Sequence, residues 1–197
     1  MKQKIPNRVI LPLKKYHLGK IKVLDVGCGF GEYLQFFGEG SMGIDIKADR
    51  VQKASGTGFH IVEGNIEDID NVDLPRNYFD AAWLSNVLEH VNSPHETLIN
   101  VSSLLKENGI AFIKIPLIPN TIFGKVYKVL SGKKKLGFLA SSHKYAFTRK
   151  TAEFDILRSG FEIVESSAFF PPNRFYKIFD FFFKDMIPTI TIVARKK

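Results

Sequence analysis

The chain has 197 residues, 45% of them hydrophobic, which suits a single domain with enough apolar content to bury a core. A formal net charge of +8 makes acidic partners such as nucleic acid, anionic lipid or an acidic small molecule candidates. The single cysteine, Cys28, excludes an internal disulfide and a cysteine-based metal cluster, and it indicates a reducing compartment.

The N-terminal apolar run at 9–13 contains Pro12 and is followed by two lysines. It is too short for the core of a signal peptide and far too short to cross a bilayer. No other window of the sequence reaches the length of a membrane helix. We therefore expect a cytoplasmic protein.

Short apolar runs alternate with helical patterns, which predicts βαβ units around a mainly parallel sheet. Strands are expected at 21–26, 41–46, 59–63, 79–85, 110–115, 161–166 and 189–194. Helices are expected at 32–37, 47–54, 94–106 and 148–159, with Asn108-Gly109 closing the third and Gly160 following the fourth.

The stretch 23–31, VLDVGCGFG, is a buried strand that continues into three alternating glycines. Glycine permits positive φ and leaves room for a ligand to approach the backbone. A dinucleotide site reads G-x-G-x-x-G and places a pyrophosphate at a helix N-terminus. Here Glu32 occupies the third glycine position, where a carboxylate repels a pyrophosphate but tolerates an ammonium or a sulfonium. A tight turn without any ligand is the alternative interpretation.

VLDVGCGFG resembles the first motif of the class I S-adenosylmethionine-dependent methyltransferases, in which the strand Asp and the glycine turn surround the amino-acid end of the cofactor. Later segments resemble the family in the same order: GID at 43–45, FDAAW at 79–83, LEHV at 88–91, LLKENG at 104–109 and HKYAFT at 143–148. The last of these resembles the small-molecule branch that includes quinone-biosynthesis methyltransferases. The resemblance covers residues 21 to about 163.

The resemblance implies a single methyltransferase domain over 1–197. Its fold is α/β and Rossmann-like: a doubly wound, seven-stranded sheet whose last strand is antiparallel. It also implies methyl transfer from S-adenosyl-L-methionine to a small-molecule or lipid-like acceptor. Two other functions remain open at this point. One is a nicotinamide-dependent oxidoreductase, which Glu32 disfavours. The other is a non-catalytic module that docks on a membrane or a protein partner.

Ten residues are predicted to bind the cofactor: Asp25, Gly27, Cys28, Gly29, Asp45, Ile46, Asn65, Ile66, Ser85 and Asn86. A carboxylate at Asp45 suits two ribose hydroxyls, although Asp45 is also a good N-cap for the helix at 47–54. The resemblance implies that Asn65 and Ile66 meet the adenine, although the family more often has Asp in place of Asn65; a simple Asx turn is the alternative. Cys28 is interpreted as a small filler residue and not as a nucleophile.

His90 and His143 are the candidate catalytic bases, because imidazole exchanges protons near neutral pH. The alternative is that both merely pack or cap. Glu89, His90 and His143 also resemble the metal site of methyltransferases with an E-x-x-E-H pattern. Asn86 replaces the first Glu of that pattern, so we expect no metal.

The stretch 116–142 fits no pattern and is a candidate substrate-capping insertion. Basic amphipathic residues at 118–130, three lysines at 133–135 and an apolar helix candidate at 175–186 are consistent with core packing, a lipid-linked substrate, peripheral membrane contact or a homodimer. Nucleic acid is not expected as a partner, since no basic groove with interleaved aromatic residues is apparent.

Overall fold

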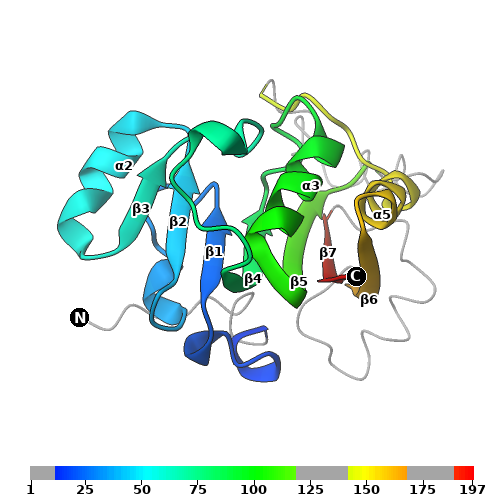
Figure 1. The fold of residues 1–197 in the computed structure, drawn as a ribbon. Coiled ribbons are helices and arrows are strands. Elements are labelled where there is room, and N and C mark those ends of the chain that lie inside the picture. Colours follow the sequence, from blue (N-terminus) through cyan, green and yellow to red (C-terminus); the bar gives the residue numbers. More distant parts are fainter. Residues whose placement is uncertain (1–11, 119–141, 168–188) are drawn as a thin grey trace, which may run out of the picture.

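The computed structural model describes residues 12–118, 142–167 and 189–197, and these form one sheet flanked by helices (Figure 1). The strands are β1 (Val23–Val26), β2 (Met42–Asp45), β3 (His60–Glu63), β4 (Phe79–Ser85), β5 (Leu105–Pro116), β6 (Phe161–Ser167) and β7 (Thr189–Lys196). The helices are α2 (Ala48–Ala54), α3 (Pro94–Leu104) and α5 (Arg149–Arg158), with short 3-10 turns η1 (Leu18–Lys20), η2 (Leu34–Phe36), η3 (Ser55–Thr57) and η4 (Ile69–Asn71).

The strand order is β3-β2-β1-β4-β5-β7-β6. Neighbouring strands from β3 to β5 run parallel, whereas β7 is antiparallel to both β5 and β6. The predicted α/β sheet of seven strands with an antiparallel last strand is confirmed. The order reverses between β1 and β4, and the crevice beyond the carboxyl ends of strands at such a switch point is the usual ligand site of this architecture.

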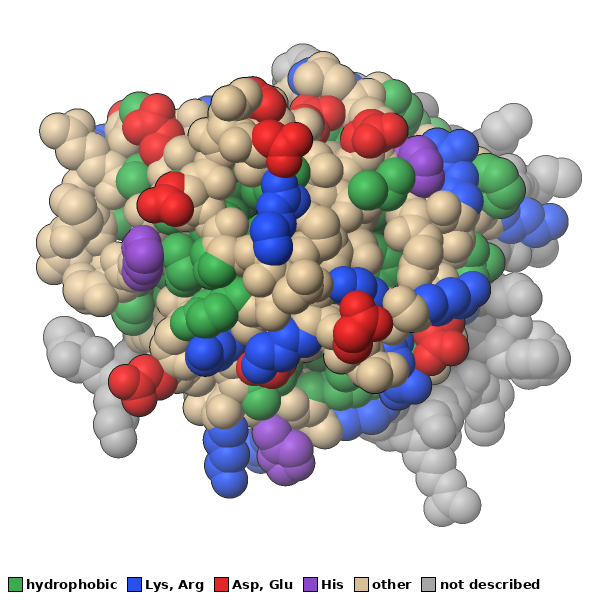
Figure 2. Space-filling view, in the orientation of Figure 1, with side chains coloured by type: hydrophobic (Ala, Val, Ile, Leu, Met, Phe, Trp, Pro, Cys, Tyr) green, Lys and Arg blue, Asp and Glu red, His purple; other side chains and the backbone are tan. Residues whose placement is uncertain are grey.

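Charged side chains of both signs are interspersed over the face shown in Figure 2. The described residues contain 17 Lys and Arg and 18 Asp and Glu, whereas the three remaining segments contain 11 and 2. The excess positive charge of the chain therefore belongs to 1–11, 119–141 and 168–188. No helix in the described part is both long enough and apolar enough to cross a membrane.

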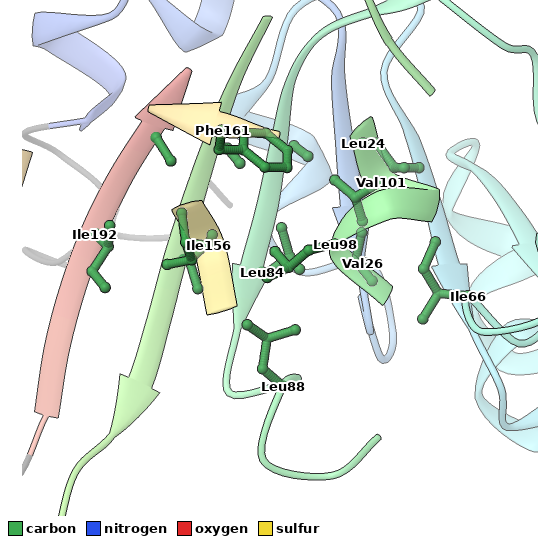
Figure 3. Packing of buried hydrophobic residues seen from close by; sticks show 14 of the residues in the cluster. Leu24, Val26, Ile66, Leu84, Leu88, Leu98, Val101, Ile156, Phe161 and Ile192 are labelled. Carbon is green, nitrogen blue, oxygen red and sulfur yellow. The ribbon is translucent and has the colours of Figure 1, made fainter. Parts of the chain in front are cut away.

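Two apolar clusters cover the two faces of the sheet, because successive strand residues point to opposite sides. Leu24 and Val26 of β1 pack with Leu98 and Val101 of α3 in the larger cluster (Figure 3). Val23 belongs instead to a second cluster of residues on the opposite face: Leu18, Val23, Leu34, Phe37, Ala81, Trp83, Phe112 and Val193. Helices α3 and α5 thus cover one face, and the short turns η1 and η2 cover the other.

The predicted helix at 32–37 is wrong: turns and the single 3-10 turn η2 take its place. The chain has no room for a longer helix, because Gly38 already docks on the end of the N-terminal segment. The Gly38 N–H donates to Leu18 O (3.0 Å) and Ile21 O (3.1 Å), and a Cβ at Gly38 would lie 2.5 Å from the Ile21 backbone.

The predicted boundary between α3 and β5 is also displaced. Helix α3 ends at Leu104, and Leu105 already pairs with Phe79 of β4. The register then jumps to Ile110 opposite Ala81, so Asn108-Gly109 lies in an irregular part of β5 instead of closing the helix. Leu105 is fully buried, at 0% exposure, and this burial favours its pairing with Phe79 over a place in the helix.

Helix α5 has the boundaries that its sequence signals predict. Thr148 is the N-cap and forms a reciprocal capping box with Thr151, and Gly160 follows the helix at φ 87°. The basic amphipathic segment at 118–130, except for residue 118, and the helix candidate at 175–186 lie outside the described residues.

Candidate functional site

A cleft of about 480 Å³ opens at the carboxyl ends of β1 to β4, on the edge that the strand order predicts. Its walls come from the segments after these four strands and from Ser142 and Lys144. Of the predicted site residues, it is lined by Gly27, Asp45, Ile46, Asn65, Ile66, Asn86 and His90. The lining does not include Asp25, Cys28, Gly29, Ser85 or His143.

The glycine turn is fastened to the end of β2 by backbone hydrogen bonds. The N–H groups of Gly27 and Cys28 both donate to Ile44 O, at 2.8 and 3.1 Å. Gly27 has φ 67°, and a Cβ there would lie 3.0 Å from the side chain of Val87. Gly29 has φ 61° and nothing within 4 Å of its missing Cβ. The turn therefore needs glycine for its backbone and leaves open space at Gly29.

Asp45 is a buried carboxylate, 4% exposed, at the end of β2. Its Oδ2 accepts from the Gly29 N–H at 2.8 Å, and its Oδ1 accepts from the Lys47 N–H at 2.9 Å. Arg50 lies 3.6 Å from Oδ2. Each carboxylate oxygen has two acceptor positions, so Asp45 retains capacity for further donors in the cleft. The N-cap residue of α2 is Lys47 and not Asp45, although Asp45 Oδ1 accepts from the N–H of that residue.

Asp25 precedes Val26, which lines the cleft, and is itself 2% exposed. Its Oδ2 has no hydrogen-bond partner in the described part of the chain. Burial raises the pKa of Asp25 well above 3.8, and the nearby carboxylates of Asp45 and Glu32 raise this pKa further. Its cross-strand neighbour Trp83 also has an indole N–H without a partner among the described residues. A buried carboxyl with a raised pKa and an oxygen without a partner suits a cationic ligand group, because a nearby cation stabilises its ionised form.

Asn65 and Ile66 lie after β3 on the same cleft as Asp45. The Asn65 Oδ1 accepts from the Glu67 N–H at 3.0 Å, which is the Asx turn expected as an alternative role. Ile66 is 6% exposed and packs in the larger apolar cluster, whereas Ile46 is 65% exposed at the rim of the cleft. The two isoleucines therefore offer one buried and one open apolar surface to a flat ligand.

The turn after β4 is shared between the cleft and the sheet. Asn86 lines the cleft with φ 61°, and its N–H donates to Lys114 O at 2.9 Å. Ser85 pairs with Lys114 in the sheet and is half-buried. Only Asn86 of this predicted pair reaches the cleft.

Cys28 packs against β2, where the missing Cβ of Gly43 would lie 2.6 Å from its Sγ. Burial raises the pKa of this thiol to about 12, and the Asp25 and Asp45 carboxylates add to the shift. A thiol in this state is not a nucleophile near neutral pH, which supports the interpretation of Cys28 as a filler residue.

His90 and His143 come together although 52 residues separate them in the sequence. Their rings meet edge to face with centroids 4.8 Å apart, and His90 lines the cleft. Glu89 lies beneath them at 0% exposure, and neither of its carboxylate oxygens has a partner in the described residues. The His90 Nε2 is 4.0 Å from Glu89 Oε1, and donor atoms of the three residues lie within 4.8 Å of one another.

Sequence reasoning missed Glu67, Asn92 and Lys144, which also line the cleft and bond to one another. Glu67 follows directly after the predicted adenine-binding pair, which is the only signal that could have pointed to it. Asn92 and Lys144 lie 52 positions apart, and only the tertiary fold brings them together.

The family assignment follows from a comparison with known proteins. The family described as methyltransferase domain matches residues 2–166. The chain belongs to this methyltransferase family. Curated relatives include the ubiquinone biosynthesis O-methyltransferase of Glaesserella parasuis, 35% identical over 47% of this chain and 44% of the relative. The protein of the same name from Rickettsia prowazekii is 26% identical over 71% of this chain and 58% of the relative. The chain thus spans about half the length of these two curated relatives.

Among solved structures, a SAM-dependent methyltransferase from Archaeoglobus fulgidus superposes with a TM-score of 0.65 at 21% identity, over 97% of this chain and 95% of that one. This likeness confirms the fold of the present chain. A nicotinamide-dependent oxidoreductase and a non-catalytic module receive no support from these comparisons. The turns after Gly31 also leave no long helix whose N-terminus could hold a pyrophosphate.

Proposed function

We propose that this methyltransferase family member transfers a methyl group from S-adenosyl-L-methionine to a hydroxyl of a small aromatic or lipid-like acceptor. The observation that carries the proposal is the cleft at the carboxyl ends of β1 to β4. Asp45 lines it, and Asp25, which precedes the lining residue Val26, has an Oδ2 without a partner among the described residues. The bound cofactor supplies a methyl carbon on a positively charged sulfur. The protein has to hold that carbon in line with the acceptor and exclude water.

The nucleoside end of the cofactor fits the β2 and β3 side of the cleft. The two oxygens of Asp45 each have one backbone donor, so both can accept a ribose hydroxyl as well. The adenine would lie between the exposed Ile46 and the buried Ile66, with Asn65 at its polar edge. Asn65 Oδ1 already serves the Glu67 N–H and has one further acceptor position.

The amino-acid end of the cofactor fits the β1 side. Its ammonium would supply a donor to Asp25 Oδ2, which has none among the described residues, and the open space at Gly29 would admit the ligand. Cys28 and Gly27 would contribute backbone, while Asn86, the member of the Ser85-Asn86 pair that lines the cleft, would lie toward the acceptor. An ammonium beside Asp25 favours its ionised form, so the carboxyl would lose its proton when the cofactor binds.

His90 and His143 are the proposed acid–base pair. One of the two imidazoles would accept the acceptor O–H proton, and the acceptor oxygen would take the methyl group that the cofactor supplies, with the electron pair of the broken C–S bond left on sulfur. The buried Glu89 carboxylate, 4.0 Å from His90, would stabilise the imidazolium that results. The names of the curated relatives, which are O-methyltransferases, support an oxygen acceptor.

The same cluster also fits a divalent cation, in contrast to the expectation from Asn86. Glu89 offers a fully buried carboxylate to which no described residue donates a hydrogen bond, and two imidazoles lie within reach of one ion. A carboxylate with two imidazoles is a donor set that Zn²⁺, Mn²⁺ or Fe²⁺ accepts. An ion held there would supply a Lewis acid for the acceptor oxygen.

Single-turnover transfer of a radiolabelled methyl group to catechol tests both arrangements. We expect His90→Ala and His143→Ala each to slow the parent rate at least tenfold, and rates within twofold of the parent would remove both from the mechanism. If a metal is used, the purified chain contains about one ion per molecule, a chelator abolishes turnover, and Glu89→Gln loses the ion. If the histidines act alone, the chelator has no effect.

A lipid-like acceptor, peripheral membrane contact and a homodimer remain proposals. They depend on 119–141 and 168–188, which lie outside the described residues and contain most of the unbalanced lysines. The capping role of 116–142 is likewise a proposal, as is a cytoplasmic location. Extraction of labelled product into an organic phase would distinguish a lipid-like acceptor from a water-soluble one.

A further inference from the structure

Asn92 joins three segments around the cleft. Its N–H and its Nδ2 donate to the two oxygens of Glu67, at 2.8 and 3.0 Å. Its Oδ1 accepts from Lys144 Nζ at 2.6 Å, and its carbonyl accepts from the Tyr145 hydroxyl at 2.7 Å. Because the amide faces an acceptor on one side and a cation on the other, only one orientation of the Asn92 side chain satisfies both.

Glu67 connects this junction, the set of hydrogen bonds around Asn92, to Asn65 and Ile66, the predicted adenine-binding residues. Its carboxylate also accepts from the Ser93 N–H at 2.7 Å, at the N-cap of α3. Its own N–H donates to Asn65 Oδ1, and Asn100 of α3 donates to Ile66 O at 2.9 Å. A carboxylate at a helix N-terminus is favourably placed, and charge-assisted bonds of this kind are strong. The segment after β3 is thus fixed to α3 at two points.

On the other side, the junction holds the segment that contains His143. The N–H groups of Lys144 and Tyr145 donate to Glu89 O at 2.8 and 3.2 Å. Ser142 O lies 3.0 Å from His90 Nδ1. His143 is therefore held between two anchored neighbours. A continuous path of hydrogen bonds runs from Asn65 through Glu67 and Asn92 to this segment.

We propose that Glu67 is a positioning residue that, through Asn92, sets His143 beside His90 and couples cofactor binding to the acceptor side of the cleft. Glu67 itself takes no part in proton or methyl transfer. The role assigned to His143 rests on the proposed function, whereas its placement by Glu67 can be measured without turnover.

A reciprocal exchange isolates the contact. Glu67→Gln sets two amide NH₂ groups against each other, and Asn92→Asp sets two carboxylates against each other. In the double variant the Gln oxygen accepts from the backbone N–H groups of 92 and 93, while its NH₂ donates to the new Asp. The double variant therefore restores the bonding pattern with donor and acceptor exchanged. The pair Asp68 and Asn71, bonded at 2.9 Å on a nearby exposed turn, provides the matched control as Asp68→Asn/Asn71→Asp.

Two measurements on the full chain report the coupling. Magnetisation transfer between the rings of His90 and His143 by NMR reports their contact, and titration with S-adenosylhomocysteine reports whether the His143 resonance responds to the cofactor side. We expect each single variant to lose at least half of the ring contact signal and of the ligand-induced shift. The double variant and the control should retain both, and the dissociation constant of the ligand should stay within threefold.

With catechol as the acceptor, each single variant should lower kcat at least fivefold with little change in KM for the cofactor, and the double variant should recover. If Glu67 had a purely structural role, each single variant would lose thermal stability without a fall in kcat at unchanged KM. The proposal is overturned if folded single variants keep the ring contact and the shift, or if the double variant fails to restore them. Absence of methyl transfer in the parent, with the ring contact and its rescue intact, would count against the proposed function instead.

Discussion

Asp25 and Asp45 are buried carboxylates on adjacent strands, and their partners differ. Asp45 accepts two backbone N–H bonds, whereas Asp25 Oδ2 has no partner in the described part. An unpaired buried carboxyl lowers stability, and it persists at binding sites where a ligand completes it. Asp25 therefore links folding stability and cofactor affinity to pH.

We expect Asp25→Asn to stabilise the empty protein at neutral pH by about 1–3 kcal/mol, the usual cost of a buried polar group without a partner. Because the folded-state pKa of Asp25 is raised above 3.8, its carboxyl costs stability increasingly as pH rises from 3.8 through that raised pKa. The gain should disappear at lower pH. Urea unfolding of parent and variant from pH 3.5 to 8 measures it.

The same substitution should weaken S-adenosylmethionine binding at least tenfold. In the parent, cofactor affinity should rise with pH through the raised pKa of Asp25, because the ionised carboxyl is the form that pairs with an ammonium. Calorimetry in two buffers of different ionisation enthalpy should detect proton release on binding. A variant that binds as tightly as the parent, with no pH dependence, would remove Asp25 from the site.

Gly43 and Cys28 make a second contact with a measurable consequence. Gly43→Ala places a Cβ 2.6 Å from Cys28 Sγ, and we expect this to cost about 1–3 kcal/mol. Cys28→Ala should cost less and should recover part of the loss in the double variant. If the two substitutions shift the melting temperature additively, the contact between Gly43 and Cys28 is contradicted. Alkylation of Cys28 at pH 8 should be slow, because its pKa is about 12.

At the residue scale, the motifs predicted what depends on local chain geometry. The turn at Gly27 and Gly29 and the carboxylate at Asp45 follow from a strand, a positive φ and a strand end. The contact between Asn92 and Lys144 depends on tertiary packing, so no spacing in the sequence indicates it. The burial of Glu89 beneath two histidines likewise depends on how distant segments meet.

At the scale of elements, helices with their own capping signals were predicted well and the connection after β1 was not. α5 begins at a capping box and ends before Gly160, both of which are local features. The run 32–37 has helical apolar spacing, yet Gly38 must reach the Ile21 backbone within a few residues. The close approach of two chain segments overrode the local pattern.

The cap of α5 can be tested directly. Thr148→Ala removes the acceptor for the Thr151 N–H, and we expect a loss of about 1 kcal/mol in the free energy of unfolding. Thr148→Ser keeps the hydroxyl and should stay within about 0.5 kcal/mol of the parent. Equal stability of the Ala and Ser variants in urea would show that the cap contributes nothing.

At the scale of the whole molecule, positive charge is separated from the described fold. The described residues are nearly balanced in sign, and the lysines at 133–135 belong to the unbalanced remainder. If these segments contact anionic lipid, the full chain should sediment with phosphatidylserine vesicles at low salt. It should be released from the vesicles at about 0.5 M salt. Replacing the three lysines at 133–135 with Gln should reduce binding severalfold. Equal sedimentation with neutral vesicles would contradict an electrostatic contact.

Every role proposed for the site residues requires that the cleft beside Asp45 binds S-adenosylmethionine. Calorimetry of the folded full chain with S-adenosylhomocysteine measures this binding, with Asp45→Asn as the matched variant. We predict saturable one-to-one binding that weakens at least tenfold in the variant, which corresponds to about 1.4 kcal/mol. No heat of binding with the folded parent, or equal affinity in the variant, would contradict binding at this cleft.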